Sequence, residues 1–436
     1  MDYCVGIDLG STTTKAVVLD PEQNILGRGI TNSRSNYDVA CQVALGEALI
    51  NARFALLDGR LQAAGIDDAR RRELLLAFEL AFREQQYRGQ LADLTERLLH
   101  HAERTGQGPD TRRAIEQITA AMRDESASLF QPGAARKSDF FRDLAGSRYI
   151  ELSEAMAKAG EHAFDPLVGL FDKAILETEN STGAVGTFAD HAEAAMHRAG
   201  DPALVDAVAK VLEIELVQRL SVGTGYGRAR LPFPEKLIRS EILCHGLGAH
   251  HMFPGTRTVL DIGGQDTKAI QVDDNGIVTS FQMNDRCAAG CGRYLGYIAD
   301  EMNLGLHELG PMADKACRTV RINSTCTVFA GAELRERLSL GEKREDILSG
   351  LHRAIVLRAM SLLARSGGVT EEFTFTGGVA KNSAAVAALQ KLIAENYGER
   401  TLNISPDSIY TGALGAALFA WREANRQQLS TTEVLS

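Results

Sequence analysis

The chain has 436 residues, of which 44% are hydrophobic and 24% are charged, an ordinary globular composition that suggests roughly two to three domains. Its net charge of -10 argues against a surface that neutralises a phosphate backbone or anionic lipid, so we expect neither nucleic acid nor a membrane as a partner. The sequence shows no secretion signal and has seven cysteines, which favours a cytoplasmic protein whose cysteines act as ligands or redox groups rather than in disulfides.

The first predicted element is a hairpin whose turn carries an aspartate and a glycine. An apolar strand over residues 3–7 leads into DLGSTTTKAVVLD, which runs from Asp8 to Asp20. A second segment, DIGGQDTKAIQVD from Asp261 to Asp273, matches it in register at the Asp, Gly, Lys, Ala and final Asp. One such hairpin is an ordinary β-turn, whereas two registered copies about 250 residues apart predict two related lobes with a ligand cleft between them.

Both turns have the composition of a phosphate site. Glycine allows close approach of the backbone, and neighbouring amides and hydroxyls can surround phosphate oxygens. Asp8 and Asp261 would face a hydrated magnesium ion rather than the phosphate itself. Of the two matching lysines, Lys15 is the better phosphate candidate because it follows three hydroxyl residues. The predicted ATP-binding residues of the two turns are Gly10, Ser11, Thr12, Thr13, Lys15, Gly263, Gly264 and Gln265.

Between the hairpins, the sequence predicts an α-helical insertion over residues 51–212. Long amphipathic stretches such as RRELLLAFELAFREQQYRGQLADLTERLLHHAE place leucine and phenylalanine on one face and arginine and glutamate on the other. Strand-like LVQRLSVGTGYGR then resumes the α/β pattern. We therefore predict a first lobe from residues 1–50 and 213–260, and a second lobe over residues 261–436. The insertion either only stabilises the fold or, as we prefer, forms an interaction surface for other subunits.

Two cysteines are predicted at the starts of helices. Cys287 is followed by apolar residues at helical spacing over residues 294–302, and Cys326 by a less regular apolar pattern. The positive end of a helix dipole lowers the pKa of a thiol. Because two cysteines cannot complete the four thiolates of a [4Fe–4S] cluster, a symmetric or pseudo-symmetric partner would have to supply two more. The alternative is that both are small buried hydrophobic residues.

A third glycine motif, FTFTGGVAKN over residues 373–382, ends a predicted strand and opens a helix. A Gly-Gly pair at such a turn lets a flat ring pack against bare backbone. TGALGAALFA, over residues 411–420, is predicted as a small-residue helix that closes the second lobe. The predicted adenosine-binding residues are Gly377, Gly378, Val379 and Asn382.

The order of two phosphate hairpins and an adenosine turn resembles the acetate kinase, sugar kinase, Hsp70 and actin superfamily. The resemblance implies an α/β, two-lobed actin-like ATPase fold, here with a helical insertion in the first lobe. It also implies magnesium-side catalytic roles for Asp8 and Asp261, with either one orienting the attacking water, and contact of Gly377 and Gly378 with adenosine. Lys15, the phosphate candidate, is the third predicted catalytic residue.

A narrower resemblance rests on NDRCAAGCGRYL, STCTVFA, GTGYGR and SEILCHGLGA, which are similar to motifs of the BadF/BadG/BcrA/BcrD ATPase family. In that family the cysteines that match Cys287 and Cys326 ligate one [4Fe–4S] cluster per pair of ATPase subunits. A threonine commonly stands where this chain has Cys291, for which helix packing is a better prediction than a ligand role. His245 is predicted to be a cleft or core histidine.

The length and the insertion resemble the larger ATPase subunit, alpha or A, of ATP-dependent class I benzoyl-CoA reductases. That resemblance implies ATP and Mg²⁺ as cofactors, ferredoxin as electron donor, an identical or homologous ATPase partner, and iron–sulfur catalytic subunits that bind the acyl-CoA. Three alternatives stay open. They are an activator of a 2-hydroxyacyl-CoA dehydratase, expected as a homodimer without the insertion; an actin-fold small-molecule kinase; and a non-enzymatic ATP-binding regulator.

Overall fold

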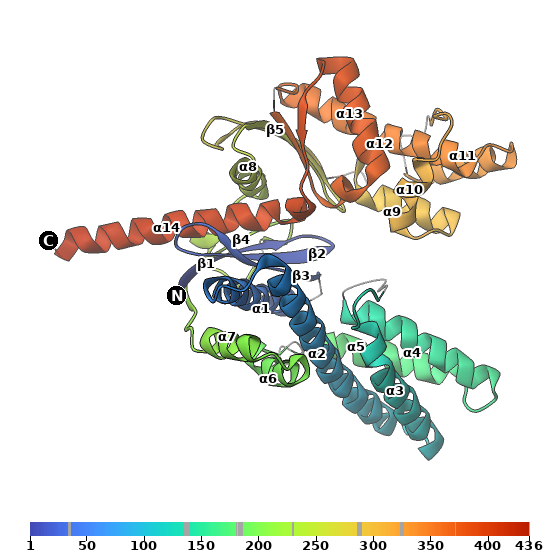
Figure 1. Cartoon of the computed structure of the whole chain (residues 1–436). Coiled ribbons are helices and arrows are strands. Elements are labelled where there is room, and N and C mark those ends of the chain that lie inside the picture. Colours follow the sequence, from blue (N-terminus) through green and yellow to red (C-terminus); the bar gives the residue numbers. More distant parts are fainter. Residues whose placement is uncertain are drawn as a thin grey trace. The chain divides into compact units, whose positions relative to one another are not determined.

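The computed structural model describes residues 1–33, 36–134, 140–179, 181, 186–228, 231–285, 290–322, 327–370 and 372–435. Contacts divide the chain into two compact units (Figure 1). The helical unit comprises Met1–Asp2 and Asn24–Val217, and the hairpin unit comprises Tyr3–Gln23 and Gln218–Ser436. Both Asp-x-Gly hairpins therefore belong to the hairpin unit. The predicted division into two lobes and an insertion at residues 51 and 212 stays a prediction.

The helical unit begins with a strand and a long helix. The first helix starts at Tyr37, well before residue 51, because Asn36 caps it: the Asn36 side chain accepts a hydrogen bond from the Val39 amide at 3.4 Å. One core joins the first half of α2 to α1, α6 and α7, and another joins its second half to α3, α4 and α5 (Figure 1). The elements are β3 (Ile25–Asn32), α1 (Tyr37–Ala63), α2 (Asp68–Arg104), α3 (Pro109–Leu129), α4 (Phe141–Lys158), α5 (Phe164–Glu179), α6 (Phe188–Ala199) and α7 (Pro202–Leu212).

The hairpin unit holds two sheets, in which the strand orders are β2-β1-β4 and β7-β6-β5-β8-β9. The strands are β1 (Asp2–Leu9), β2 (Thr13–Leu19), β4 (Val217–Thr224), β5 (Thr256–Ile262), β6 (Thr267–Val272), β7 (Val278–Asn284), β8 (Glu372–Thr376) and β9 (Thr401–Asn403). The α-helices are α8 (Glu241–Met252), α9 (Gly292–Met302), α10 (Leu309–Ala313), α11 (Thr327–Ser339), α12 (Arg344–Ser366), α13 (Ser383–Tyr397) and α14 (Thr411–Leu435). Short 3₁₀ helices are η2 (Glu235–Leu237), η4 (Leu306–Glu308), η5 (Gly378–Lys381) and η6 (Pro406–Tyr410).

The sequence repeat is also a structural repeat. Strands β1 and β2 pair antiparallel with Asp8 opposite Lys15, and strands β5 and β6 pair antiparallel with Asp261 opposite Lys268. Since side chains alternate along a strand, this shared register gives the two aspartates equivalent places at the ends of their strands. The registered Asp and Lys of the two segments thus occupy the same positions in two hairpins.

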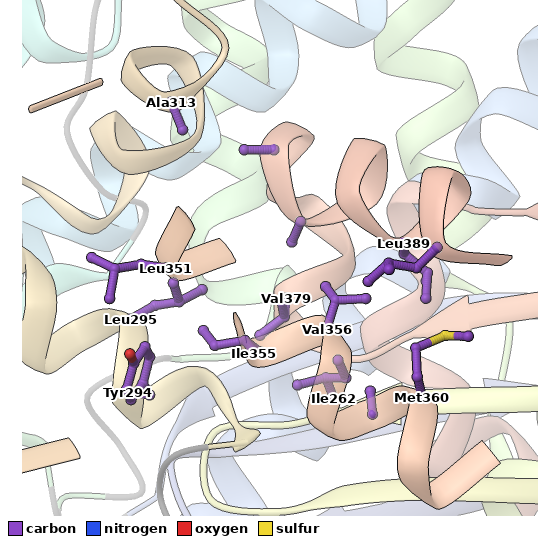
Figure 2. Close-up of a cluster of buried hydrophobic side chains, with 14 of the residues drawn as sticks. Ile262, Tyr294, Leu295, Ala313, Leu351, Ile355, Val356, Met360, Val379 and Leu389 are labelled. Atoms are coloured by element: carbon purple, nitrogen blue, oxygen red, sulfur yellow. The ribbon is translucent and has the colours of Figure 1, made fainter. Parts of the chain in front are cut away.

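Side chains alternate along β5 and β6, so apolar residues of these strands pack into a core on each face of the larger sheet. Val259 and Ile270 pack with residues of α8, whereas Leu260 and Ala269 belong to the largest core, on the opposite face. Helix α12 supplies Ile355 to that core, beside side chains from α9 and α13 (Figure 2).

Two of the described helices, α1 and α12, are long and apolar enough to span a membrane by length and composition alone. Buried core helices of soluble proteins meet the same criteria.

Bare glycine backbone brings α8, α14 and β1 into contact. A Cβ at Gly415 of α14 would overlap the carbonyl of Cys244 in α8, and one at Gly6 of β1 would overlap the carbonyl of Ala413. The small residues of TGALGAALFA therefore let two helices and a strand pack at backbone distance. This contact places the start of α14 beside the hairpin aspartates.

We expect Gly415→Ala to destabilise the protein by about 3 kcal/mol, because backbone must move to make room for the methyl group. Gly296→Ala in α9 is a matched control, since a Cβ there meets nothing within 4 Å. It should leave stability unchanged or raise it by about 0.5–1 kcal/mol through helix propensity. Thermal unfolding followed by circular dichroism measures both. Equal melting temperatures for the two variants would contradict the packing argument.

Candidate nucleotide site

The two Asp-x-Gly turns lie against each other. A Cβ added at Gly264 would stand 2.5 Å from the hydroxyl oxygen of Thr12, so the second turn approaches the hydroxyl-rich first turn through bare backbone. In the first turn, the ammonium of Lys15 lies 3.3 Å from where a Cβ of Gly10 would be. A cation, hydroxyls and close glycine backbone are thus gathered in one place, as a phosphate group requires.

Asp261, at the end of β5, is held from several sides. Thr376 donates to its Oδ1 at 2.8 Å, and the Lys268 ammonium lies 3.3 Å from its Oδ2. Nδ1 of His245 lies 3.4 Å from Oδ1 and 3.2 Å from the Thr411 hydroxyl. The carboxylate is 2% exposed, so these contacts fix its orientation in a site largely closed to water.

The charges around Asp261 keep it ionised. Burial opposes ionisation, but the charges of His245 and Lys268 and the hydroxyl of Thr376 outweigh it, and the pKa of Asp261 is lowered to about 2. Burial would also lower the pKa of Lys268, yet the carboxylates of Asp261, Asp266 and Glu241 raise it. Asp266 lies 2.8 Å from the Lys268 ammonium. Lys268 is therefore a permanent counter-charge inside a group of carboxylates.

Asp8, at the end of β1, is enclosed by glycines. A Cβ at Gly225 would lie 2.5 Å from one carboxylate oxygen of Asp8, and a Cβ at Gly412 would lie 2.8 Å from the other. The same Cβ at Gly412 would lie 2.9 Å from Nε2 of His245. Nε2 of His245 and a carboxylate oxygen of Asp8 therefore both approach Gly412, at the start of α14. The other ring nitrogen of His245, Nδ1, contacts Asp261. Because its partners come from distant segments, no local sequence pattern predicted its place between the two aspartates.

The predicted adenosine turn follows β8 directly. Gly377 has a φ of 86°, and a Cβ there would overlap the carbonyl of Ile262, so only glycine fits. At Gly378 a Cβ would meet nothing within 4 Å, which leaves open space over bare backbone. Val379 is buried in the core, and the Asn382 side chain accepts a hydrogen bond from the Ala385 amide at 3.0 Å, capping α13.

These residues suit ATP with magnesium. Mg²⁺ needs only one or two protein carboxylates when phosphates and waters supply its other ligands, and Asp8 and Asp261 offer two. Within the described residues, no group of three or more His, Cys, Asp or Glu side chains is arranged to hold a metal by itself. The contacts of the predicted ATP-site residues Ser11, Thr13 and Gln265 with a nucleotide stay predictions.

The predicted cluster ligands, Cys287 and Cys326, lie outside the described residues. The apolar pattern that follows Cys287 is confirmed as the buried face of α9. That helix begins at Gly292 with Cys291 at its N-cap, so the cysteine next to its first turn is Cys291. Helix α11 begins at Thr327, directly after Cys326. Cys291 is fully buried, and burial raises the pKa of Cys244 to about 12, as expected for a core thiol.

A sequence model of the BadF/BadG/BcrA/BcrD ATPase family matches residues 5–420. The chain belongs to the BadF/BadG/BcrA/BcrD ATPase family. The resemblance read from the cysteine and glycine motifs is thereby confirmed. In this family member, the matching region includes both hairpins, the adenosine turn and the helices of the helical unit.

Curated relatives include activators of dehydratases. The activator of lactoyl-CoA dehydratase from Anaerotignum propionicum is 42% identical over 207 residues, which cover 48% of this chain and 77% of that protein. The (R)-2-hydroxyglutaryl-CoA dehydratase activating ATPase from Acidaminococcus fermentans is 42% identical over 204 residues, 47% of this chain and 76% of that protein. A benzoyl-CoA reductase component from Thauera aromatica is 32% identical over 191 residues, 44% of this chain and 68% of that protein.

Two solved structures confirm the predicted fold. The crystal structure of the Acidaminococcus fermentans (R)-2-hydroxyglutaryl-CoA dehydratase component A has a TM-score of 0.55 at 23% identity, covering 98% of this chain and 100% of that one. The activator of the 2-hydroxyisocaproyl-CoA dehydratase from Clostridium difficile with bound ADPNP has a TM-score of 0.53 at 24% identity, covering 98% and 97%. The fold is the α/β actin-like ATPase fold with a helical insertion.

Proposed function

We propose that this ATPase couples hydrolysis of ATP to the delivery of one low-potential electron to an acyl-CoA-transforming partner. The observation that carries the proposal is the pair of registered hairpins, whose buried aspartates and glycine turns meet beside an open glycine-rich adenosine turn. Water would attack the terminal phosphate of ATP to give ADP and phosphate. A reduced ferredoxin would supply the electron, and iron–sulfur subunits that bind the acyl-CoA would accept it.

The relatives favour a dehydratase over benzoyl-CoA reductase as the partner enzyme. The chain's length and helical insertion by themselves predicted benzoyl-CoA reductase as the partner enzyme. Two dehydratase activators are each 42% identical to the matched half of this chain, against 32% for the benzoyl-CoA reductase component. We therefore propose a 2-hydroxyacyl-CoA dehydratase as the first candidate acceptor, with benzoyl-CoA reductase second. The proposed setting is the cytoplasm, without nucleic acid or membrane as partners.

A [4Fe–4S] cluster held by Cys287 and Cys326 with two cysteines of an identical or homologous subunit would supply a one-electron carrier. The described part of the chain contributes the helix that starts directly after Cys326 and the helix that has Cys291 at its N-cap position. Helix starts favour negative charge, and four thiolates carry it. The proposed role of the ATPase residues is to bind nucleotide and move these helices.

Iron and acid-labile sulfide should be measured on anaerobically purified wild type, Cys287→Ala and Cys326→Ala, each with its co-expressed partner. We expect about four irons per pair of ATPase subunits in the wild type and loss of the iron in both variants. Cys317→Ala is the control, because Cys317 is an exposed free cysteine. Iron-free wild type that still hydrolyses ATP would refute the electron-transfer proposal and favour a kinase or a regulator.

A further inference from the structure

We propose that three hydrogen bonds form a latch that carries the state of the nucleotide from the second hairpin turn to the start of α9. The latch consists of Thr267 with Gly290, Gly263 with Gly292, and Gly264 with Arg293. It rests on the proposed function, in that ATP must bind at the two turns. It adds the contacts through which the chain that follows Cys287 would respond to ATP.

The latch is made of hydrogen bonds between segments well separated in the sequence. The Thr267 hydroxyl, which is 1% exposed, donates to the Gly290 carbonyl at 2.5 Å. The amides of Gly292 and Arg293 donate to the carbonyls of Gly263 and Gly264, both at 2.8 Å. The first turn of α9 is thereby fastened to the Asp-x-Gly turn itself, and no mobile side chain intervenes in the two backbone bonds.

The geometry of the peptide unit makes these two backbone bonds sensitive to a phosphate. A carbonyl and the amide of the next residue belong to one rigid, planar unit and point in opposite directions. The carbonyl of Gly263 therefore moves with the Gly264 amide, and the carbonyl of Gly264 moves with the Gln265 amide. If these amides turn toward a phosphate, both carbonyls must reorient on the side where α9 receives them.

Two further features suit this contact to transmit movement. A Cβ at Gly292 would stand 3.1 Å from the Gly263 carbonyl oxygen, so backbone meets backbone without a compliant side chain between them. Thr267, Asn284 and Gly290 also line a cavity of about 530 Å³, closed on another side by residues of α12. The backbone contact at Gly292 is therefore firm, whereas the Thr267–Gly290 bond borders open space, which gives Gly290, just before α9, room for a second position.

Hydrogen–deuterium exchange of the purified full-length chain, with and without Mg²⁺ and ADPNP, tests the latch because Gly292 and Arg293 are themselves the amide donors. In the wild type we expect nucleotide to slow exchange at residues 263–266, where amides would face the phosphate, and to change exchange at residues 292–296, whose acceptor carbonyls reorient. Thr267→Val keeps the shape but removes a donor, and should speed exchange at the start of α9 without nucleotide by about fivefold, the loss expected for one ordinary hydrogen bond.

Gly292→Pro cuts the latch more completely. The proline ring would replace the Gly292 N–H that points at the Gly263 carbonyl, so that carbonyl must move away from α9. Proline is accepted at the first position of a helix, and Cys291 before it already has the extended backbone that proline requires, so α9 itself should persist. The amide donor to Gly263 is lost, and we expect nucleotide still to slow exchange at residues 263–266 but no longer to change exchange at residues 293–296. Thr256→Val is the control, since that buried hydroxyl pairs with Thr374 in the same sheet at 2.5 Å.

The outcomes separate the latch from the proposed function. If nucleotide protects the turn of the wild type but leaves the start of α9 unchanged, or if Gly292→Pro still transmits the change, the latch is wrong and ATP binding stands. If saturating nucleotide leaves residues 263–266 of the wild type unaffected, ATP does not bind at this turn, and the proposed function fails together with the latch.

Discussion

Asp261→Asn should bind ATP about as tightly as the wild type yet hydrolyse it about 10²–10⁴ times more slowly. The carboxylate is ionised at any pH above about 2, and it is oriented by Thr376 and Lys268. Asparagine keeps the size and one acceptor oxygen but has no charge for the magnesium-bound water or the attacking water. The loss should therefore appear in kcat, measured by phosphate release, while the Kd for ADPNP changes little.

The control for this prediction is Asp274→Asn, which removes an exposed carboxylate that pairs with Arg257 in the hairpin unit. It should leave kcat and KM unchanged. Asp8→Asn, made in parallel, decides between the two equivalent positions of the repeat. If only one of the two site variants loses kcat, that aspartate orients the water; if the other loses Mg²⁺ affinity instead, it holds the ion. Full ATPase activity in both variants would place hydrolysis elsewhere.

The repeat was predictable because its signal is local. The strand register of each hairpin is determined by about a dozen consecutive residues. Aligning Asp8 with Asp261 therefore also aligned Lys15 with Lys268, and in the structure each aspartate pairs with its lysine across the two strands. The open space at Gly378 likewise follows from a Gly-Gly pair between a strand and a helix. Contacts between residues far apart in the chain could not be predicted in this way. His245 meets Thr411 from 166 residues away, and no pattern near either residue indicates this.

The helical unit shows the same limit. Its amphipathic periodicity predicts helices, and helices are found, since burying one apolar face requires only a 3.6-residue repeat. Which polar groups pair inside the unit depends on how the helices cross. Arg83 of α2 lies 2.7 Å from Glu47 of α1 and donates to Gln86 and Asn51, a partly buried network that fixes α1 against α2. Arginine and glutamate on the polar face gave no indication of these particular pairs.

Lys15 and Lys268 occupy the same position in the two hairpins, yet we expect replacement by methionine to reduce stability at Lys268 and ATP affinity at Lys15. Lys268 is 2% exposed and lies against Asp261 and Asp266, whereas Lys15 is partly exposed beside Gly10. Removing a buried partner of carboxylates costs about 3–5 kcal/mol. Lys268→Met should therefore lower the melting temperature by about 10 °C, whereas Lys15→Met should leave it nearly unchanged and raise KM for ATP.

The dependence on pH makes the prediction for Lys268 specific. The raised pKa of Lys268 contributes stability that is complete below the usual lysine value of about 10.4 and is lost as pH rises through the folded-state value. The lowered pKa of Asp261 contributes stability above its usual value of about 3.9, lost as pH falls toward about 2. Both contributions are complete in the wild type between pH of about 5 and 8.

In Lys268→Met the neighbouring carboxylates repel one another without a counter-charge, so their protonation relieves the repulsion. The difference in melting temperature between this variant and the wild type should therefore be largest near pH 8 and should shrink toward pH 5, as those carboxyls take up protons. Calorimetric scans across this range measure it, with Lys15→Met as the matched control. A deficit that is constant with pH would mean that Lys268 stabilises the turn by packing rather than by charge.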